Sequence, residues 1–549
     1  MAIAVSEAVV GESEVISYNS PGFKGLIKEP YIFCLACFAS IGGLLFGYDQ
    51  GVISGVLVMS NFAKEFPSLA NDATLQGWML SILTLGAMIG ALFNGPISDK
   101  FSRRWSILYA EILFLIGSIL QCAAMTVAMM FIGRLLSGLA IGMTSMVIPL
   151  YLSEIAPPNI RGSLVTLQQL GITLGIMVAF WLQYGTQYIG GTGDYQSQAA
   201  WRLPLALQCL PCLILAIGTF FLPYSPRWLM QKGREEEALQ TLCRLRRVSP
   251  DDHRVQLEIL EIKVAQKFEE KTSPSTSKNQ SSIRAALEQY WQFFRTSHLR
   301  KRIIIACALQ IIQQFTGINA IIYYAPQIFK AVGLQGSTVS LLATGVVGVI
   351  DFLATIPAIL YMDRWGRRKV LIIGGIGMSI SQLIIATLYA VYKNSWSEHP
   401  AAGWAACAFV WVYIAHFAFS IGSVNWIIPS EIFPPAVRGK AVGLAIASNW
   451  LSNFIVALIY PRMLKAITFG TFYFFLAFCL ILIVWVYFFL PETKGVSMEQ
   501  MDQIFGGSSA QENIQLMAEI RDELGLSGSG KVIGEEKVEE LDTSHVEKV

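Results

Sequence analysis

Twelve long apolar runs constrain this chain more than any other feature of its sequence. A helix needs roughly 20 mostly apolar residues to cross the hydrocarbon core of a bilayer, and each run is about that long. Charged residues are only 14% of the chain, against roughly a quarter in soluble proteins, so a soluble fold could not cover this apolar surface. The sequence therefore predicts an all-α membrane protein. Its expected transmembrane helices lie near 31–58, 76–98, 105–125, 127–152, 163–186, 203–223, 301–331, 338–361, 370–392, 404–429, 440–462 and 470–490.

The basic residues of the loops predict the orientation of these helices. Lysines and arginines cluster after the second, eighth and tenth spans and Arg161 follows the fourth, whereas the opposite loops carry isolated cations. Cytosolic loops are enriched in these residues, so we expect both termini in the cytosol. Residues 1–20 lack a basic start and a short apolar core, so no cleaved signal peptide is expected. We expect the protein to lie in the plasma membrane.

A charged segment separates the first six spans from the last six. Within it, residues 233–247 and 253–270 are amphipathic and are expected to form surface helices, whereas the polar stretch 271–282 resembles a disordered linker. The expected organisation is a cytosolic N-terminal segment 1–30, a six-helix bundle 31–223, a cytosolic helical linker 224–300, a second six-helix bundle 301–490 and a cytosolic tail 491–549.

The two bundles repeat each other in sequence. SEIAPPNIRG at 153–162 recurs as SEIFPPAVRG at 430–439, and DKFSRR at 99–104 recurs as DRWGRR at 363–368. Each copy follows the corresponding span of its half. Parallel six-span repeats place a substrate path between the halves, near the middle of the membrane.

The acidic and basic residues of the SEI motifs are candidates for a gate. Glu154 and Arg161 keep the same spacing as Glu431 and Arg438, with prolines between them. This pattern suggests ion pairs that close the cytosolic side in one conformation and break in another. The alternative is that these charges only set the topology of the helices.

Seven stretches together resemble the sugar porter family of the major facilitator superfamily. They are FGYDQGVISG (46–55), GRLLSG (133–138), SPRWL (225–229), QQFTGINAIIYYAP (313–326), DRWGRR (363–368), SEIFPPAVRG (430–439) and PETKG (491–495). The chain looks most similar to fungal hexose and pentose transporters. The resemblance covers roughly 30–500 and implies the twelve-helix major facilitator fold, alternating access and a monosaccharide substrate.

Three positions depart from the family pattern. Ser102 stands where the family usually has glycine, so a less tight turn is expected there. Tyr224 stands where the family has a glutamate, which puts one cytosolic ion pair in doubt. Asp351 lies in the eighth span, where several relatives carry asparagine.

Amides within the apolar spans are candidates for binding a sugar, because sugar hydroxyls need amide and hydroxyl partners beside a flat apolar surface. The TGIN sequence (316–319) also interrupts its helix, as expected where the backbone bends around a ligand. The alternative is that such amides only join helices. By resemblance, the sugar-binding residues are Gln169, Gln313, Gln314, Asn319, Trp426, Asn449 and Trp450, with Tyr324 near the outer gate.

Charged residues within membrane spans are costly and therefore informative. Asp49 in the first span and Arg134 in the fourth lie at similar depths, so the two side chains could form a pair. Protonation of Asp49 would remove the attraction and free Arg134 to bond elsewhere, which would make the pair a proton switch. The alternative is a static buried pair. The resemblance agrees with the switch, because proton-coupled sugar porters carry an acid and an arginine at these positions.

Asp351 is a candidate determinant of selectivity. It lies near mid-membrane, where an ionised carboxylate would accept sugar hydroxyls but repel the carboxylate of a sugar acid. We therefore expect a neutral monosaccharide.

The sequence thus predicts a sugar/H⁺ symporter whose partners are a sugar, a proton and the lipid bilayer. A passive facilitator and a sugar-sensing receptor of the same fold are the alternatives. No nucleophile–base pair or metal cluster is evident, so neither an enzyme nor a bound metal or cofactor is expected. A net charge of only +2 gives no support for a nucleic-acid partner.

Overall fold

The computed structural model describes residues 28–157, 160–191, 193–272, 290–291, 293–331 and 337–494, together with a few positions between 501 and 523. In these residues the protein is helical and contains no strand. Twelve helical spans are long and apolar enough to cross a membrane, at the positions expected from the sequence to within a few residues. The polar stretch 273–282 and most of the tail lie outside the described residues.

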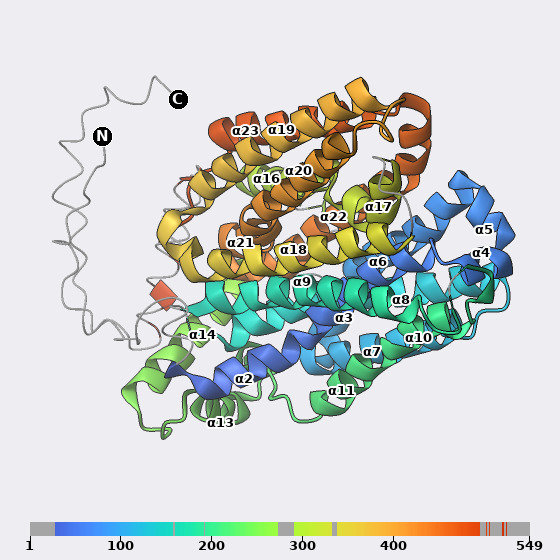
Figure 1. Cartoon of the computed structure of the whole chain (residues 1–549). Coiled ribbons are helices and arrows are strands. Elements are labelled where there is room, and N and C mark those ends of the chain that lie inside the picture. The colour runs from blue at the N-terminus through green and yellow to red at the C-terminus, as the bar shows by residue number, and fades with distance from the viewer. Residues whose placement is uncertain are drawn as a thin grey trace, which may run out of the picture.

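The first half of the chain forms six of these spans (Figure 1). Its helices are α2 (Pro30–Ala39), α3 (Ile41–Val56), α6 (Ala73–Phe101), α7 (Arg103–Cys122), α8 (Val127–Ile155), α9 (Arg161–Thr186), α10 (Ala199–Leu207) and α11 (Cys209–Thr219). The short elements α4 (Ser60–Glu65), α5 (Pro67–Asn71) and η2 (Gly193–Tyr195) connect spans. Helices α2 and α3 together make the first span, and α10 and α11 make the sixth.

The second half forms the other six spans. Its helices are α16 (Ser297–Phe315), α17 (Ile318–Ala331), α18 (Ser337–Trp365), α19 (Arg367–Tyr392), α20 (Pro400–Phe419), α21 (Ile421–Ile432), α22 (Pro435–Ile467) and α23 (Gly470–Phe489). Helices α16 and α17 share the seventh span, and α20 and α21 share the tenth.

The seventh span is broken where the sequence predicted a break. Helix α16 ends at Phe315, and Gly317 then adopts φ +96°, a left-handed conformation that side chains other than glycine rarely take. A Cβ atom at this position would also lie 2.6 Å from the ring of Phe475. The interruption therefore separates α17 from α16 as a distinct helical segment, which confirms the expected bend.

Between the halves, α9 packs against α18 and α6 packs against α22. Figure 1 shows α9 and α18 running side by side along this boundary. In lipid, association between helices depends on close packing rather than on the hydrophobic effect, so small residues allow the tightest approach. Within the first half, Gly138 of α8 illustrates this, because a Cβ atom there would lie 2.0 Å from the carbonyl oxygen of Leu83 on α6.

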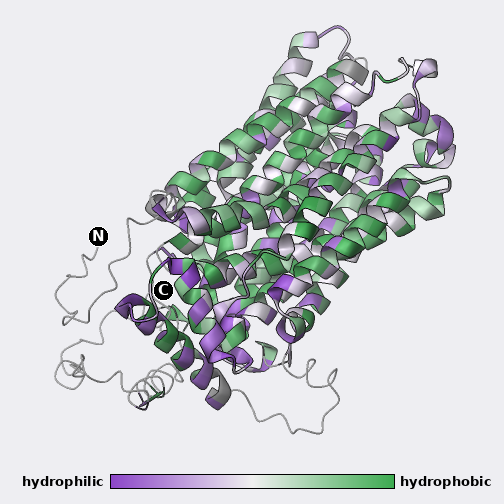
Figure 2. Cartoon of the chain, turned by 90° about the horizontal axis from the view of Figure 1, so that it is seen from below, coloured by the Kyte–Doolittle hydropathy of each residue, from purple (hydrophilic) through white to green (hydrophobic). Residues whose placement is uncertain are grey.

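In the described part of the linker, the structure has helices α12 (Pro226–Gln231), α13 (Glu235–Arg246) and α14 (His253–Thr272). The last two confirm the surface helices predicted from the amphipathic stretches. Trp228, Leu229, Leu242, Val255 and Ile259 form a small apolar core of their own. Figure 2 shows hydrophobic residues along the spans and hydrophilic residues gathered where this linker lies. We call this the linker end of the bundle and the opposite end, beside α4 and α5, the far end.

Replacing Gly138 with alanine should destabilise the protein, because its Cβ atom would force the backbones of α6 and α8 apart. Overpacking of this kind costs about 1–3 kcal/mol. Gly185→Ala is the matched control, since a Cβ atom there would meet nothing within 4 Å. Thermal unfolding in detergent should show a lower midpoint for Gly138→Ala alone. Equal midpoints in the two variants would contradict the close approach of α6 and α8.

Candidate functional site

Three of the amides predicted from the seventh span join Asn449 of α22 in one buried network. Asn319 donates to the side-chain oxygen of Gln314 at 2.6 Å, and Gln314 donates to that of Asn449 at 2.9 Å. Asn449 in turn donates to the oxygen of Gln313 at 2.8 Å. All four side chains are at least 95% buried. The break before α17 positions this network, because it turns Asn319 back toward the last turn of α16.

Two further amides belong to the same network and were missed by the sequence reasoning. Gln310 accepts from Asn449 at 2.7 Å and from Asn425 of α21 at 2.6 Å, while its own amide donates to the backbone oxygen of Asn425. Asn425 also donates to Gln313. Helical spacing offered a signal for Gln310, since it lies three and four residues before two of the predicted amides. Asn425 directly precedes the predicted Trp426.

Both predicted tryptophans lie beside this network, at the boundary between the halves. The ring of Phe46 on α3 lies 4.9 Å from Trp450 and 6.3 Å from Trp426, measured between centroids. Trp450 is fully buried and donates its indole N–H across the boundary to Ser145 at 3.2 Å. Trp426 lines a small pocket with Gln310 and Asn425. The aromatic surface is therefore shared by both halves, and Phe46 is a member that the sequence reasoning did not single out.

The remaining candidates for sugar contact are buried but lie apart from the hydrogen-bonded network. Gln169 of α9 is 6% exposed, and no hydrogen bond joins it to the network in the part of the chain described. Tyr324 donates to the backbone oxygen of Ala457 at 3.2 Å and sits at a non-helical position within α17. Asp351 of α18 is buried, and its Oδ1 has no hydrogen-bond partner among the described residues.

Asp49 and Arg134 are both fully buried in the first half and interact electrostatically. Neither carboxyl oxygen of Asp49 has a hydrogen-bond partner among the described residues. Arg134 instead donates to the backbone oxygen of Met79 at 2.8 Å and more weakly to Gln121 at 3.5 Å. An ionised carboxylate without partners would be very costly at this depth, so the arrangement suits a neutral Asp49.

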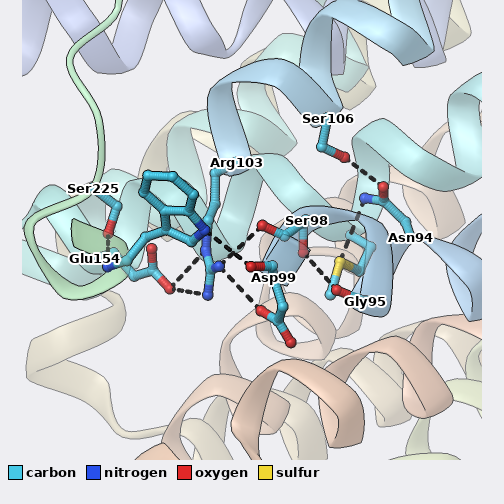
Figure 3. Close-up of polar contacts among 10 residues, drawn as sticks. Asn94, Gly95, Ser98, Asp99, Arg103, Ser106, Glu154 and Ser225 are labelled. Carbon is cyan, nitrogen blue, oxygen red and sulfur yellow. Dashed lines mark hydrogen bonds and ion pairs between the residues drawn. The ribbon is translucent and has the colours of Figure 1, made fainter. Parts of the chain in front are cut away.

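Ion pairs at the linker end hold together the repeated loops, and Figure 3 shows those of Arg103 in the first half. Arg103 lies between two acids, donating to Glu154 at 2.9 and 3.1 Å and to Asp99 at 3.0 Å. In the second half, Arg367 donates to Glu431 at 2.7 Å, and the same acid accepts from Thr493 at 2.6 Å. The two halves therefore repeat an arginine–glutamate contact between the loop motif and the SEI motif.

These pairs add partners to those expected for the gate. Glu154 and Glu431 form ion pairs with Arg103 and Arg367, whereas their pairing with Arg161 and Arg438 stays a prediction. The side chain of Arg161 lies outside the described residues. Arg438 donates to the backbone oxygen of Phe433 at 3.2 and 3.3 Å and also lines a pocket beside Glu154. Sequence spacing within one motif could not reveal that another loop also supplies a cation to its glutamate.

The two departures from the family pattern at the linker end take defined structural roles. Ser102 adopts φ 92°, almost the value of its counterpart Gly366 at 84°, so the turn is not loosened as expected. Tyr224 stacks on Trp228 with ring centroids 5.5 Å apart and accepts from the indole of Trp105. The guanidinium of Arg104 lies 5.3 Å from the Tyr224 ring centre. At the position where the family has a glutamate, this chain therefore makes a cation–π contact.

Two repeated six-helix halves with a buried polar network at their boundary define a multi-pass membrane carrier. The family described as "Sugar (and other) transporter" matches residues 35–505, so the chain belongs to this family of the major facilitator superfamily. Sugar transport protein MST8 of Oryza sativa subsp. japonica is 37% identical over 495 residues, covering 87% of this chain and 91% of that protein. Quinate permease of Emericella nidulans is 33% identical over 526 residues, covering 92% and 95% respectively.

Among solved structures, the chain is similar to the proton:xylose symporter XylE bound to 6-bromo-6-deoxy-D-glucose. The sequence identity is 30% and the TM-score is 0.74, and the match covers 87% of this chain and 99% of that one. These relatives are transporters, so the protein is a transporter of this family rather than an enzyme.

Gln314→Ala and Asn319→Ala should weaken sugar binding, because each removes a buried polar partner worth about 1–3 kcal/mol. That range corresponds to roughly 5- to 150-fold in dissociation constant. Gln208→Ala is the control, since Gln208 is an equally buried amide outside the network. Calorimetric titration of the purified protein measures the affinities. Unchanged affinity in both network variants, or an equal loss in the control, would indicate that these amides only join helices and do not bind sugar.

Proposed function

We propose that the protein carries a neutral monosaccharide together with a proton by alternating access. The observation that carries the proposal is the state of Asp49, a fully buried acid without hydrogen-bond partners among the described residues, close enough to Arg134 to interact with it. A carrier that moved sugar alone would gain nothing from an acid held at such cost in the membrane interior. The likeness to a proton:xylose symporter supports the same function.

Asp49 and Arg134 offer the two states that a proton switch needs. In the proposed neutral state of Asp49, Arg134 keeps its bonds to Met79 and Gln121. When Asp49 loses its proton, the resulting carboxylate attracts Arg134 across a dry interior, which favours a different packing of α3 and α8. The proton therefore changes which contacts are most stable within the first half, and this difference is the source of coupling.

The amide network and the aromatic surface supply the contacts for a sugar. Gln310, Gln313, Gln314, Asn319 and Asn449 present donors and acceptors that can exchange their mutual hydrogen bonds for bonds to hydroxyls. Phe46, which touches both tryptophans, brings the first half to the same place. A sugar bound there would contact both halves, as alternating access requires.

The ion pairs of Arg103 and Arg367 act as the closing contacts of the linker end in this proposal. They join repeated motifs within each half and order the surface that bears Arg438 and the linker helices. The linker end faces the cytosol, as the basic loops favour, and the membrane is the plasma membrane.

A second class of cargo is a cyclic polyol that carries a carboxylate. The relative named quinate permease favours it. The buried acid Asp351 favours a neutral sugar in its ionised form, because its carboxylate would then repel that of the cargo, whereas its protonated form would not.

Uptake by proteoliposomes tests the proposal directly. Labelled glucose, galactose, xylose and arabinose are offered with and without an inward proton gradient, beside labelled quinate and galacturonate. The proposal expects accumulation of at least one neutral monosaccharide above equilibrium only when the gradient is present. Uptake that stops at equilibrium under both conditions would identify a passive facilitator instead.

Asp49→Asn should abolish accumulation under a proton gradient while preserving sugar exchange, because asparagine resembles the neutral acid but cannot release a proton. Glu111→Gln provides a matched control, since Glu111 is another buried acid of the first half. Accumulation and counterflow are measured in the same vesicles. Retained accumulation by Asp49→Asn, or loss only in Glu111→Gln, would place the coupling elsewhere.

Asp351→Asn should keep neutral-sugar transport and relieve the penalty against carboxylated cargo. Each 1.4 kcal/mol of repulsion between an ionised Asp351 and the carboxylate of the cargo would lower the affinity for that cargo about tenfold. The measurement is competition by galacturonate and quinate against the labelled monosaccharide in wild type and variant. Strong competition by either acid in the wild type would overturn the preference for neutral sugars.

A further inference from the structure

Gln50, the residue after Asp49, connects the proposed proton site to the second half of the protein. Its side-chain amide donates to the hydroxyl of Tyr323 on α17 at 3.1 Å. Both side chains are at least 97% buried. The same hydroxyl accepts from Asn453 of α22 at 3.3 Å. One phenolic oxygen thus holds an amide from each half, in a dry environment where each bond is costly to leave unmade.

The first part of helix α17, residues 318–323, carries Tyr323 and is suited to move as a unit. The break at Gly317 separates it from α16, and Tyr324 interrupts its helical geometry at φ −118° and ψ 15°. Segments that pivot between two positions usually do so at a few residues of this kind near the ends of helices. The hydrogen bond between Gln50 on α3 and Tyr323 therefore helps to hold this segment in its present position.

The same face of α17 also reaches the amide network. Asn319 and Tyr323 are four residues apart, so they are neighbours on one side of the helix. Asn319 bonds to Gln314 in the network, and Tyr323 bonds to Gln50. A short rigid helical turn thus joins the amides proposed to bind sugar to the residue beside Asp49.

We propose that Gln50 and Tyr323 are positioning residues that transmit the proton occupancy of Asp49 to the sugar-binding amides through α17. This inference rests on the proposed proton-coupled function and deepens it. Arg134 on α8 is the charged group acting on Asp49, and Tyr48 and Tyr323 are the hydroxyl groups in electrostatic contact with it. Tyr48 is held within the first half by a 2.7 Å bond to Pro204, which leaves Tyr323 as the hydroxyl that crosses to the other half.

In this proposal the charge of Asp49 sets the direction of the coupling. Asp49 and Gln50 are successive residues of α3 and point about 100° apart, so a movement of Asp49 toward Arg134 also moves Gln50. Ionisation of Asp49 draws this part of α3 toward Arg134 on α8. That movement withdraws Gln50 from Tyr323, releases α17 and displaces Asn319 from the network. Protonation restores the bond and returns Asn319 to Gln314, so the proton and the sugar stabilise the same conformation.

The test uses Tyr323→Phe, which removes only the hydroxyl, and Gln50→Leu, which removes the amide from the other side of the bond. Tyr151→Phe is the control, because the buried Tyr151 hydroxyl bonds to Pro223 within the first half. In full-length protein, sugar affinity is measured at acidic and at alkaline pH, and accumulation and counterflow are measured in proteoliposomes.

In the wild type and in Tyr151→Phe we expect affinity to fall by about 5- to 150-fold at alkaline pH, the usual range for coupled sites. In Tyr323→Phe and Gln50→Leu the pH dependence should flatten and accumulation should be lost, while counterflow persists. The double variant should behave like either single one, since both remove the same bond. A merely structural role would lower stability and counterflow without flattening the pH profile.

The outcomes distinguish failure of the link through α17 from failure of the proposed proton-coupled transport. If the wild type accumulates sugar under a proton gradient and both variants keep its pH profile, the link through α17 is wrong and proton coupling stands. If the wild type itself does not accumulate any sugar, the proposed symport fails and the link falls with it. If Tyr323→Phe does not fold, Gln50→Leu alone decides between these outcomes.

Discussion

The absence of water in the hydrocarbon core is the constraint on which the rest of this structure depends. A polar group placed there must find its partner within the protein, because an unsatisfied one costs several kcal/mol. The amides of the second half obey this rule by bonding to one another around Asn449. Among the buried acids of the described spans, Asp49 stands out because both of its carboxyl oxygens lack such partners. A buried polar group that lacks a hydrogen-bond partner in the membrane interior is therefore a candidate for a functional role.

The boundary between the halves is well packed but, in the described residues, is held by few specific polar contacts. Much of its area is helix packed on helix, and its buried polar contacts include single bonds such as those of Trp450 with Ser145 and Gln50 with Tyr323. A single neutral hydrogen bond contributes only about 1 kcal/mol net. Separating the halves on one side therefore disturbs few specific contacts, and a bound ligand or proton can shift the balance between conformations.

The sequence predicted the features of single helices and motifs. It did not predict several side-chain contacts between segments that are distant in the chain. The spans and the break at TGIN follow from composition and local propensity, and Gln314 and Asn319 were recognised as polar groups in an apolar helix. The partner of Glu154 was not foreseen, because Arg103 comes from another loop brought near by the fold. Tyr323 was overlooked for the same reason, since an aromatic residue in a membrane helix reveals its role only through the amides that meet its hydroxyl.

The replacement of a glutamate by Tyr224 gives equivalent corners of the two repeats different kinds of contact. In the second half, the carboxylate of Glu492 accepts the backbone N–H groups of Arg367 and Arg368, which fixes the loop backbone through directional bonds. At the equivalent corner of the first half, the guanidinium of Arg104 lies over the aromatic face of Tyr224, and this attraction tolerates sliding of the cation across the ring. The duplicated architecture therefore has one stiff corner and one compliant corner at its linker end.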